Sequence, residues 1–301
     1  MSNILRTDGS DTGKTLAQHL EARGAELARA RLSGVSFGAA DLTLAELGAA
    51  QLDAAKLDGA TLKSAKLRGA DLSGASLRNA CLESADLRDA TLTGADLQGA
   101  SLSGANLEGA RLDGCQLEGA RFDRARLRGV DLSSAALADN SWNSADLREC
   151  CLRGLDFDTA AFADVDLRGA DLSAASLRWT RFHRSKLAGA RLSGAKLDSA
   201  NMPDADLKGC ELNGASLDNA WLTDADLRGA CFTKASLSGA KLAGAKHTGV
   251  ELRDQEARGL DLAELELTSA PSEAEGSSAE AASTGCLLWL VALPLGAMAL
   301  L

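Results

Sequence analysis

The sequence has no tyrosine, only 3 prolines and 3% aromatic residues, although 46% of its 301 residues are apolar. So few aromatic side chains exclude a broad globular core built on Phe, Tyr and Trp, and they indicate a thin core of small and aliphatic residues. The apolar fraction excludes general disorder. An excess of Lys and Arg is also missing, because 32 basic residues stand against 42 acidic ones, a formal net charge of −10. This balance argues against a protein that coats nucleic acid and leaves an acidic mimic of nucleic acid open.

What the sequence does have is a repeat of five residues. From Leu32 to Leu242 every fifth residue is Leu, Phe, Met or Trp, without one insertion or deletion. Two residues before each of them, from Ala30 to Ala240, the residue is small in nearly every case. Residues five positions apart do not share one face of an α-helix, and they alternate between the two faces of a flat strand. Neither a straight helix nor a flat strand can therefore bury all of these residues together. The pattern predicts a coiled ribbon whose backbone turns every five residues.

A second period gives the number of sides in one coil. Triplets of Asp, Leu and a basic residue recur at multiples of 20, beginning at residues 86, 146, 166, 206 and 226. The large residues of the repeat also follow one another at intervals of 20: Phe122, Trp142, Phe162, Phe182 and Met202. Four sides of five residues each explain both observations. Residues 20 apart then stack in neighbouring coils about 4.8 Å apart, and nearly eleven coils make a rod about 50 Å long.

The repeated unit, small-(Asp/Asn)-Leu-polar-polar, resembles that of the pentapeptide-repeat family. Good copies are ADLSG at 70–74, ADLQG at 95–99, ANLEG at 105–109 and ADLRG at 225–229. The resemblance implies an all-β fold, a right-handed quadrilateral parallel β-helix of about 11 coils, and the handedness rests on the resemblance alone. The small and polar residues at the fifth position suit tight corners.

The repeat divides the chain into five predicted segments. These are an N-terminal cap at 1–29 with a short helix, the β-solenoid at 30–250, a capping coil or helix at 251–270, a flexible linker at 271–285 and a hydrophobic tail at 286–301. Thr15 and Gln18 fit a capping box at the start of the N-terminal helix. The linker is assigned from its polar composition.

The tail is predicted to anchor the protein to a membrane, since an uncharged run from Ala281 to Leu301 is long enough to cross one as a helix. Its apolar residues include Leu287, Leu288, Trp289, Leu290, Val291, Leu293 and Leu295. A dimerisation or capping element and a sorting signal are the alternatives. Residues 1–20 lack the apolar core of a signal peptide, so we expect a cytoplasmic body, anchored to the inner membrane by the C-terminus.

Groups that carry chemistry are scarce. The three histidines are far apart in the sequence, and no two of the seven cysteines have CxxC spacing. Cys115, Cys150 and Cys210 take the small inward position, where a thiol acts as a slightly larger methyl group. We expect no catalytic, metal or cofactor site, and no enzyme activity.

Two surface features rise above the regular pattern. A basic column consists of Arg68, Arg88, Arg128, Arg148, Arg168, Lys208 and Arg228. Flanking aspartates favour a ladder of compensated charges there. A candidate partner-binding group consists of Trp179, Arg181, His183, Arg184 and Trp221, because exposed Trp and Arg dominate binding hot spots. The alternative for Trp179 is that it covers a coil widened by the irregular segment 137–186.

Two functions follow as hypotheses. The first is a non-catalytic rod that binds a protein partner and is tethered by its tail. The second, implied by the family resemblance, is a DNA mimic that binds and protects DNA gyrase or topoisomerase IV and dimerises through its C-terminal region. Direct binding of nucleic acid is not expected. Residues 30–250 carry only −3 of the net charge and residues 251–301 carry −7. A mimic of duplex DNA needs its negative field along the rod, so the first hypothesis is favoured.

Overall fold

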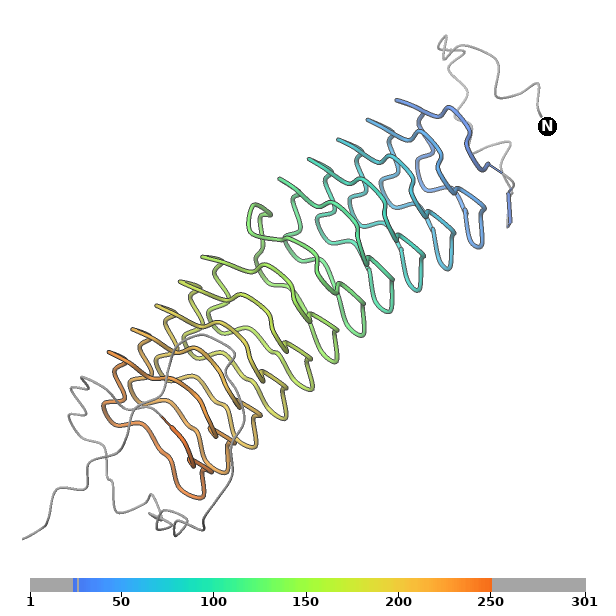
Figure 1. Ribbon diagram of the computed structural model, residues 1–301. Coiled ribbons are helices and arrows are strands. Elements are labelled where there is room, and N and C mark those ends of the chain that lie inside the picture. Colours follow the sequence, from blue (N-terminus) through green and yellow to red (C-terminus); the bar gives the residue numbers. More distant parts are fainter. Residues whose placement is uncertain (1–23, 26, 251–301) are drawn as a thin grey trace, which may run out of the picture. The chain divides into compact units, whose positions relative to one another are not determined.

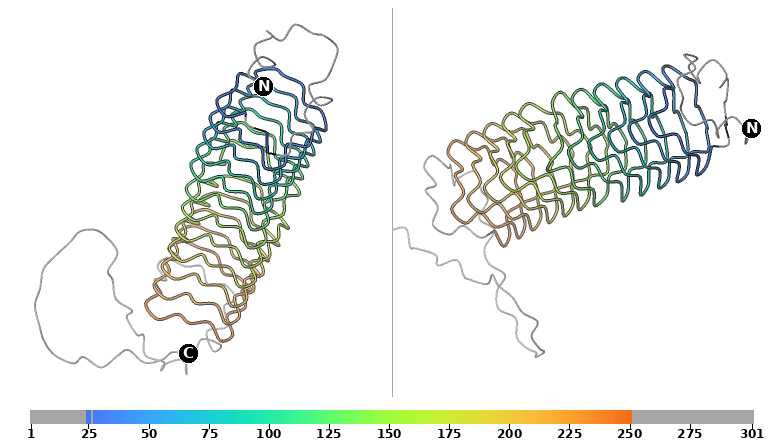
Figure 2. Two further views of the ribbon diagram at one scale, coloured as in Figure 1. Left: turned by 90° about the vertical axis from the view of Figure 1, so that its right-hand side faces the viewer. Right: turned by 90° about the horizontal axis from the view of Figure 1, so that it is seen from above.

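The computed structural model describes residues 24–25 and 27–250. These belong to the first of two compact units, Met1–Glu266 and Leu267–Leu301. The described residues contain no helix and no continuous strand, only single bridge residues that alternate with two-residue turns every five positions. Parallel bridges join residues 20 apart, from Arg31↔Gln51 to Asp226↔Lys246. The predicted four-sided coil of 20 residues is therefore confirmed, and the coils stack into a rod with aligned corners (Figures 1 and 2).

We name the sides by the coil at 180–199. Side 1 contains residues 180–182, side 2 contains 185–187, side 3 contains 190–192 and side 4 contains 195–197, with corners between them. Every residue 20 positions earlier or later has the same place in its own coil.

Each corner is a tight turn closed by one backbone hydrogen bond. In the corner after Leu42, for example, Ala45 donates its N–H to the Leu42 carbonyl over 3.0 Å. The residue before Ala45, Leu44, has a φ of 61°. A positive φ at the third residue of a turn is the mark of type II geometry and favours Gly or Asn there. Gly99, with a φ of 68°, occupies such a place, which explains the small and polar fifth position of the repeat.

Where Asp or Asn precedes the central residue, its side chain closes the following corner from outside in most of the described coils. Its side-chain oxygen accepts the backbone N–H two residues later over 2.9–3.3 Å, at twelve places. They are Asp41, Asp71, Asp86, Asp96, Asn106, Asp131, Asp146, Asp156, Asp166, Asp171, Asp206 and Asp226. A short acceptor side chain that bonds its own backbone two residues on is the Asx turn. Many surface acids of the rod thus have a structural role.

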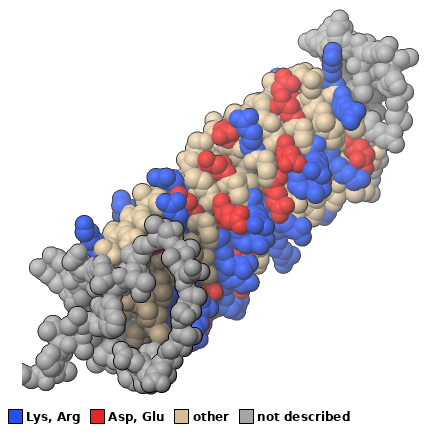
Figure 3. Space-filling view, viewed as in Figure 1, with Lys and Arg blue, Asp and Glu red and all other residues tan. Residues whose placement is uncertain are grey.

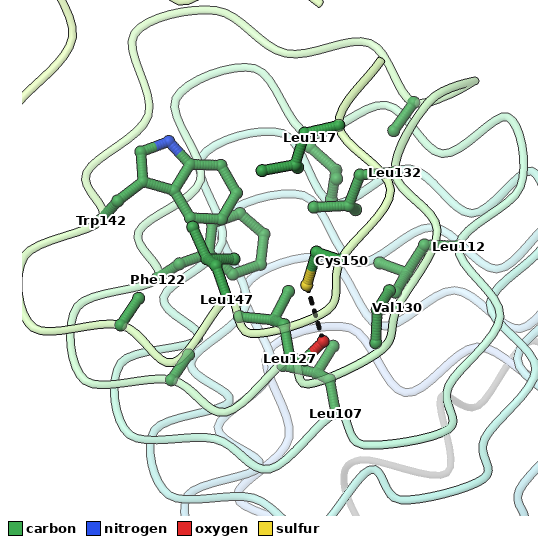
Figure 4. Packing of buried hydrophobic residues seen from close by; sticks show 14 of the residues in the cluster. Leu107, Leu112, Leu117, Phe122, Leu127, Val130, Leu132, Trp142, Leu147 and Cys150 are labelled. Carbon is green, nitrogen blue, oxygen red and sulfur yellow. Dashed lines mark hydrogen bonds between the residues drawn. The ribbon is translucent and has the colours of Figure 1, made fainter. Parts of the chain in front are cut away.

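The interior is a narrow column of Leu and Ala with one aromatic stack. Phe122 and Trp142 lie parallel, with ring centroids 4.4 Å apart and planes 5° apart (Figure 4). Phe162 follows at 6.3 Å from Trp142, and Phe182 lies 5.3 Å beyond Phe162. Both Phe182 and Met202 are fully buried. The large residues predicted to stack every 20 positions therefore do so on side 1.

Polar residues at the small inward position bond to the coil beneath them. Cys150 points its thiol at the Leu127 carbonyl over 2.9 Å (Figure 4), and Thr180 donates to Phe157 over 2.8 Å. Cys115, Cys210 and Ser185 make the same contact with the carbonyl 23 residues earlier. Burial raises the pKa of the Cys115, Cys150 and Cys210 thiols to about 12. These cysteines are neutral filler, as their position predicts.

One corner breaks the regularity. Residues 137–140 form neither a bridge nor the usual two-residue turn, and the bridge pairs 111/131, 136/156 and 141/161 are missing from the described ladder. Leu137 is only half buried, which corrects the expectation that every central residue lies inside. The green part of the tube departs from the aligned corners here (Figure 1). The predicted irregular segment 137–186 is much shorter, because regular bridges resume at Asp146↔Asp166.

The repeat geometry reaches both limits of the described residues. Leu27 is buried and accepts the N–H of Ala30 over 3.0 Å, as a regular corner does. At the other limit His247 replaces Leu, yet Val250 still donates to its carbonyl over 3.1 Å. No helix able to cross a membrane occurs among residues 24–25 and 27–250. The predicted N-terminal helix, the segment 251–270, the linker and the hydrophobic tail lie outside the described residues.

Candidate functional site

The basic column forms the edge between sides 2 and 3, and each of its members contacts a carboxylate. Arg148 holds Asp146 with two nitrogens, at 2.8 and 2.5 Å. Arg88, Arg168 and Arg228 hold the Asp two residues before them in the same way. The remaining contacts are Arg68–Asp89 at 3.1 Å, Arg128–Glu149 at 2.7 Å and Lys208–Asp226 at 3.2 Å.

These contacts keep the aspartates ionised. The hydrogen bond from the Arg228 side chain lowers the pKa of Asp226, and a second cation, Lys208, adds to the effect. The side chain of Arg148 likewise lowers the pKa of Asp146. Basic and acidic side chains lie beside one another along the visible face of the rod (Figure 3). The edge is therefore a ladder of ion pairs whose charges are compensated locally.

The two exposed tryptophans lie on another part of the surface. Trp221 is the middle residue of side 1 and is 49% exposed, and Trp179 is at the corner before side 1 and is 56% exposed. Bridges connect Arg181 to Asn201 and Asn201 to Trp221, so Arg181 and Trp221 share one column. Two coil steps separate them by about 10 Å. His183 and Arg184 lie at the opposite corner of side 1, so side 1 and its corners bring together all five candidate partner-binding residues.

A cation lies over the ring of each exposed tryptophan. The Lys241 ammonium is 3.7 Å from the centroid of the Trp221 ring, and the Arg178 guanidinium is 5.9 Å from that of Trp179. Such cation–π contacts stabilise by about 0.5–1 kcal/mol at exposed sites. Sequence reasoning missed Lys241. Its signal was its position 20 residues after Trp221, which places it directly beside the indole in the next coil.

The three other candidate residues, Arg181, His183 and Arg184, differ in whether an acid of the rod already binds them. Two nitrogens of Arg184 bind Asp164, at 2.8 and 2.9 Å, so this side chain is held by the rod. Arg181 is exposed and has no carboxylate within 4 Å in the described part of the chain. His183 is also exposed. Arg181 is thus the cation on side 1 best placed to meet an external acid.

Trp179 does not cover a widened coil. Thr180 donates to Leu177 across its corner over 3.3 Å, and bridges from Arg181 to Ala161 and to Asn201 hold the coil on both sides. The interrupted corner lies at 137–140, two coils away. The exposure of the Trp179 ring is therefore not explained by the packing of the rod.

Reactive or metal-binding clusters are not found on this surface. Among the described residues no group of His, Cys, Asp and Glu is arranged to hold a metal ion, and no disulfide joins any of the six cysteines there. A shallow hollow of about 350 Å³ on side 2 is lined by Asp86, Arg88, Asn106 and Arg126 among others. Its carboxylate, Asp86, is bound by Arg88 at 2.6 Å.

A family model described as pentapeptide repeats matches the chain in eight copies, over residues 23–59, 45–83, 55–94, 95–133, 143–178, 175–214 and 204–239. The chain belongs to the pentapeptide-repeat family. Its fold is accordingly the right-handed quadrilateral β-helix of that family. The matches skip residues 134–142, which contain the interrupted corner.

Two solved members illustrate the range of the family. HetL, a pentapeptide repeat protein involved in heterocyst differentiation regulation in the cyanobacterium Nostoc sp. strain PCC 7120, is 34% identical, over 78% of this chain and 91% of HetL, at a TM-score of 0.33. Full-length QnrB1, a plasmid-mediated fluoroquinolone resistance protein, is 22% identical, over 62% of this chain and 88% of QnrB1, at a TM-score of 0.29. No curated protein is significantly similar to this chain.

Proposed function

We propose that this protein is a non-catalytic rod that binds a protein partner through side 1. The observation that carries the proposal is the pair of exposed indoles, Trp179 and Trp221, on one side of a rod whose other large apolar residues are nearly all buried. Tryptophan and arginine are the residue types most enriched at binding hot spots. Here Arg181 lies in the same coil as Trp179 and two coils before Trp221. A flat, loopless side suits a partner surface better than a small substrate.

The carboxylates of the ion-pair edge also support a non-catalytic role, because they are already bonded to other groups of the rod. Asp226 caps its own corner and binds two cations, and Asp146 does the same with one arginine. General acid–base catalysis needs a titrating group with a pKa near the working pH. The pKa of these carboxyls is instead held below the ordinary range.

Position-specific crosslinking tests the proposal. A photo-crosslinking amino acid replaces Asn201, which lies between Arg181 and Trp221 on side 1. The matched control carries it at Glu211, the outward residue of side 3 in the same part of the rod. We expect a discrete adduct with one partner, identified by mass spectrometry, from position 201 alone in the native cell. Equal adducts from both positions would refute side 1 as the binding surface.

The location of the rod is a second part of the proposal. The apolar composition of residues 286–301 supports a tether to the inner membrane, with the body in the cytoplasm. Fractionation of the full-length chain and a 1–270 form tests this. The full-length chain is expected in the membrane fraction and the shorter form in the soluble fraction. Equal distribution of the two forms rules the tether out and leaves the binding role of side 1 untouched.

A further inference from the structure

One complete coil of the rod has charge of a single sign. Residues 177–196 contain six Lys and Arg residues and no Asp or Glu. The coil before it, 157–176, and the coil after it, 197–216, each have a net charge of −3. A second stretch without Asp or Glu, residues 227–250, contains four Lys and Arg residues, among them Lys241. Basic and acidic residues mix within the other coils of the described rod. The positive coil contains Trp179 and Arg181, so the concentration of charge coincides with the candidate binding surface.

The neighbouring coils neutralise only part of this charge. Arg178 binds Asp158 at 2.9 Å, Arg184 binds Asp164 at 2.8 Å, and Arg191 lies 3.5 Å from Glu211. Arg181, Lys186 and Lys196 have no carboxylate within 4 Å among residues 24–25 and 27–250. Of these three, Arg181 is on side 1, in the column that continues through Asn201 and Trp221 to Lys241.

Side 1 therefore presents two cations and two indoles in a short strip. Along the column, Arg181 and Trp221 are about 10 Å apart and Trp221 and Lys241 about 5 Å apart. Trp179 precedes Arg181 by two residues at the corner. The Lys241 ammonium is held over the Trp221 ring rather than by an acid, so its charge is available to an incoming anion. The strip extends over about 15 Å of the rod.

We propose that this strip binds an acidic segment of a partner protein, whose carboxylates reach Arg181 and Lys241 and whose apolar side chains pack on Trp179 and Trp221. The inference rests on the proposed function and adds the chemistry of the partner. Charge complementarity selects an acidic ligand, and the indoles select one that also carries apolar groups. A partner rich in Lys and Arg is excluded by the same charges.

The borders of the strip favour a protein over a nucleic acid. Asp204 and Asp224 lie exposed along one corner of side 1, and Asp198 and Asp218 lie along the other. A nucleic acid strand carries a phosphate at every nucleotide, about 3.4 Å apart along a duplex axis, and its continuous charge would meet these acids. Carboxylates spaced along a polypeptide reach the two cations and leave the flanking aspartates uncontacted.

The backbone conformation at Trp179 allows a substitution that tests binding without disturbing the fold. Its φ is 56°, in the left-handed region that a bulky side chain disfavours and that glycine occupies at many other corners of the rod. Trp179→Gly therefore suits the corner while it removes the indole. If the Trp179 side chain serves packing, Trp179→Gly lowers the stability of the rod. If it serves binding, Trp179→Gly folds normally and loses affinity for the partner.

Fluorescence anisotropy with defined probes tests the inference on the full chain. The probes are a labelled peptide of alternating Glu and Ser with two Phe, its counterpart with Gln for every Glu, and an oligothymidylate of equal length. We expect the acidic peptide to bind at least about tenfold more tightly than the other two, and more weakly as NaCl screens the charges. Trp179→Gly and the double variant Arg181→Gln, Lys241→Gln are each expected to weaken binding about tenfold or more.

The matched control is Lys196→Gln, which removes an unpaired cation of the same coil from side 4 and should leave affinity within about twofold. Equal loss in Lys196→Gln and Arg181→Gln would show attraction to net charge and overturn the inference. Tighter binding of oligothymidylate would overturn it in favour of nucleic acid. Equal binding of the Glu and Gln peptides, together with a crosslinked partner at position 201, would refute the acidic ligand and leave the proposed function standing. Circular dichroism confirms that each variant is folded.

Discussion

Asn140 gives the sharpest test of how the interrupted corner is held. It occupies the small inward position, where the repeat has Ala in most copies, so a consensus rule predicts that Asn140→Ala stabilises the rod. The structure predicts the opposite. The Asn140 side-chain amide donates to the carbonyl of Leu117 over 2.6 Å and to that of Ala120 over 3.0 Å, both in the coil beneath.

The size of the effect follows from these two bonds. An intramolecular hydrogen bond contributes about 0.5–1.5 kcal/mol net, so losing both costs about 1–3 kcal/mol. The lower part of that range applies, because Leu117 still accepts the backbone N–H of Ala120 over 2.9 Å. We expect a loss of about 1–2 kcal/mol. Thr180→Ala is the matched control in the same column, since it removes a single bond of 2.8 Å and should cost about half as much.

Urea unfolding measures the difference between these variants. The buried Trp142 lies two residues from Asn140 and reports on this coil by fluorescence once the other three tryptophans are replaced by Phe. Asn140→Ala should lower the midpoint of the Trp142 transition more than Thr180→Ala does. A higher midpoint for Asn140→Ala than for the unchanged chain would refute the bonding argument and support the consensus rule.

Three further predictions concern the core and the ion-pair edge. Iodoacetamide should modify Cys81, Cys151 and Cys231 in the folded protein before Cys115, Cys150 and Cys210, as peptide mapping would show. Burial and a pKa of about 12 keep the latter three thiols shielded and neutral. Equal rates of modification would contradict their burial. Asp226→Asn should cost about 1 kcal/mol at pH 7. The pKa of Asp226 is lowered in the fold, so that contribution is present above the ordinary carboxyl pKa and is lost as the pH falls below about 4. Urea midpoints of the two proteins should therefore converge in acid, and a constant gap would refute the role of the charge. Trp142→Leu restores the commonest central residue, yet it should cost about 2 kcal/mol in thermal or urea unfolding, because Phe122 loses its stacked partner at 4.4 Å; an unchanged midpoint would show that the stack adds nothing.

The periods of five and 20 were enough to predict the rod, because they leave the backbone little choice. A central Leu and a small residue two positions earlier are buried together only if the chain turns within each repeat. The stack of Phe122, Trp142 and Phe162 follows from the 20-residue interval alone. The corner chemistry was also predictable from the sequence. The fifth-position residues of the described rod have positive φ values, among them Gly99 and Trp179, with Ala39 and Ser134 as the exceptions.

The interrupted corner could not be predicted from the pattern. Leu137 keeps the correct residue type at the correct spacing, and nothing is inserted near it. Leu137 is nevertheless half buried, and it lies in the same corner as Asn140, whose amide donates to two carbonyls beneath it. Hydrophobic periodicity records which residues prefer burial and contains no information about a competing side-chain hydrogen bond of this kind.

The candidate site was predictable in its composition and less so in its contacts. Trp179 and Trp221 are conspicuous because they replace the polar residues usual at outward positions, and Arg181 lies in the same column as Trp221. Whether an arginine is available depends on the coils above and below it. Arg184 is held by Asp164, 20 residues away, whereas Arg181 faces Ala161 and Asn201 in the corresponding places. Aligning the sequence in rows of 20 residues exposes these neighbours, and it would also have shown Lys241 beside Trp221.

The same contacts argue against the alternative function as a DNA mimic. Such a protein needs carboxylates that form a continuous negative field along the rod. Here Asp146 and Asp226 cap corners and bind cations, and corner acids such as Asp158 accept a hydrogen bond from a serine hydroxyl, that of Ser176, over 2.7 Å. A belt of six cations without an acid interrupts the field at 177–196. We therefore expect the chain neither to inhibit supercoiling by purified gyrase nor to rescue it from a quinolone at about micromolar concentration, the range of ordinary specific binding. Inhibition or rescue in that assay would show that gyrase binds the rod although its charges are compensated. The DNA-mimic function would then be favoured over the binding rod.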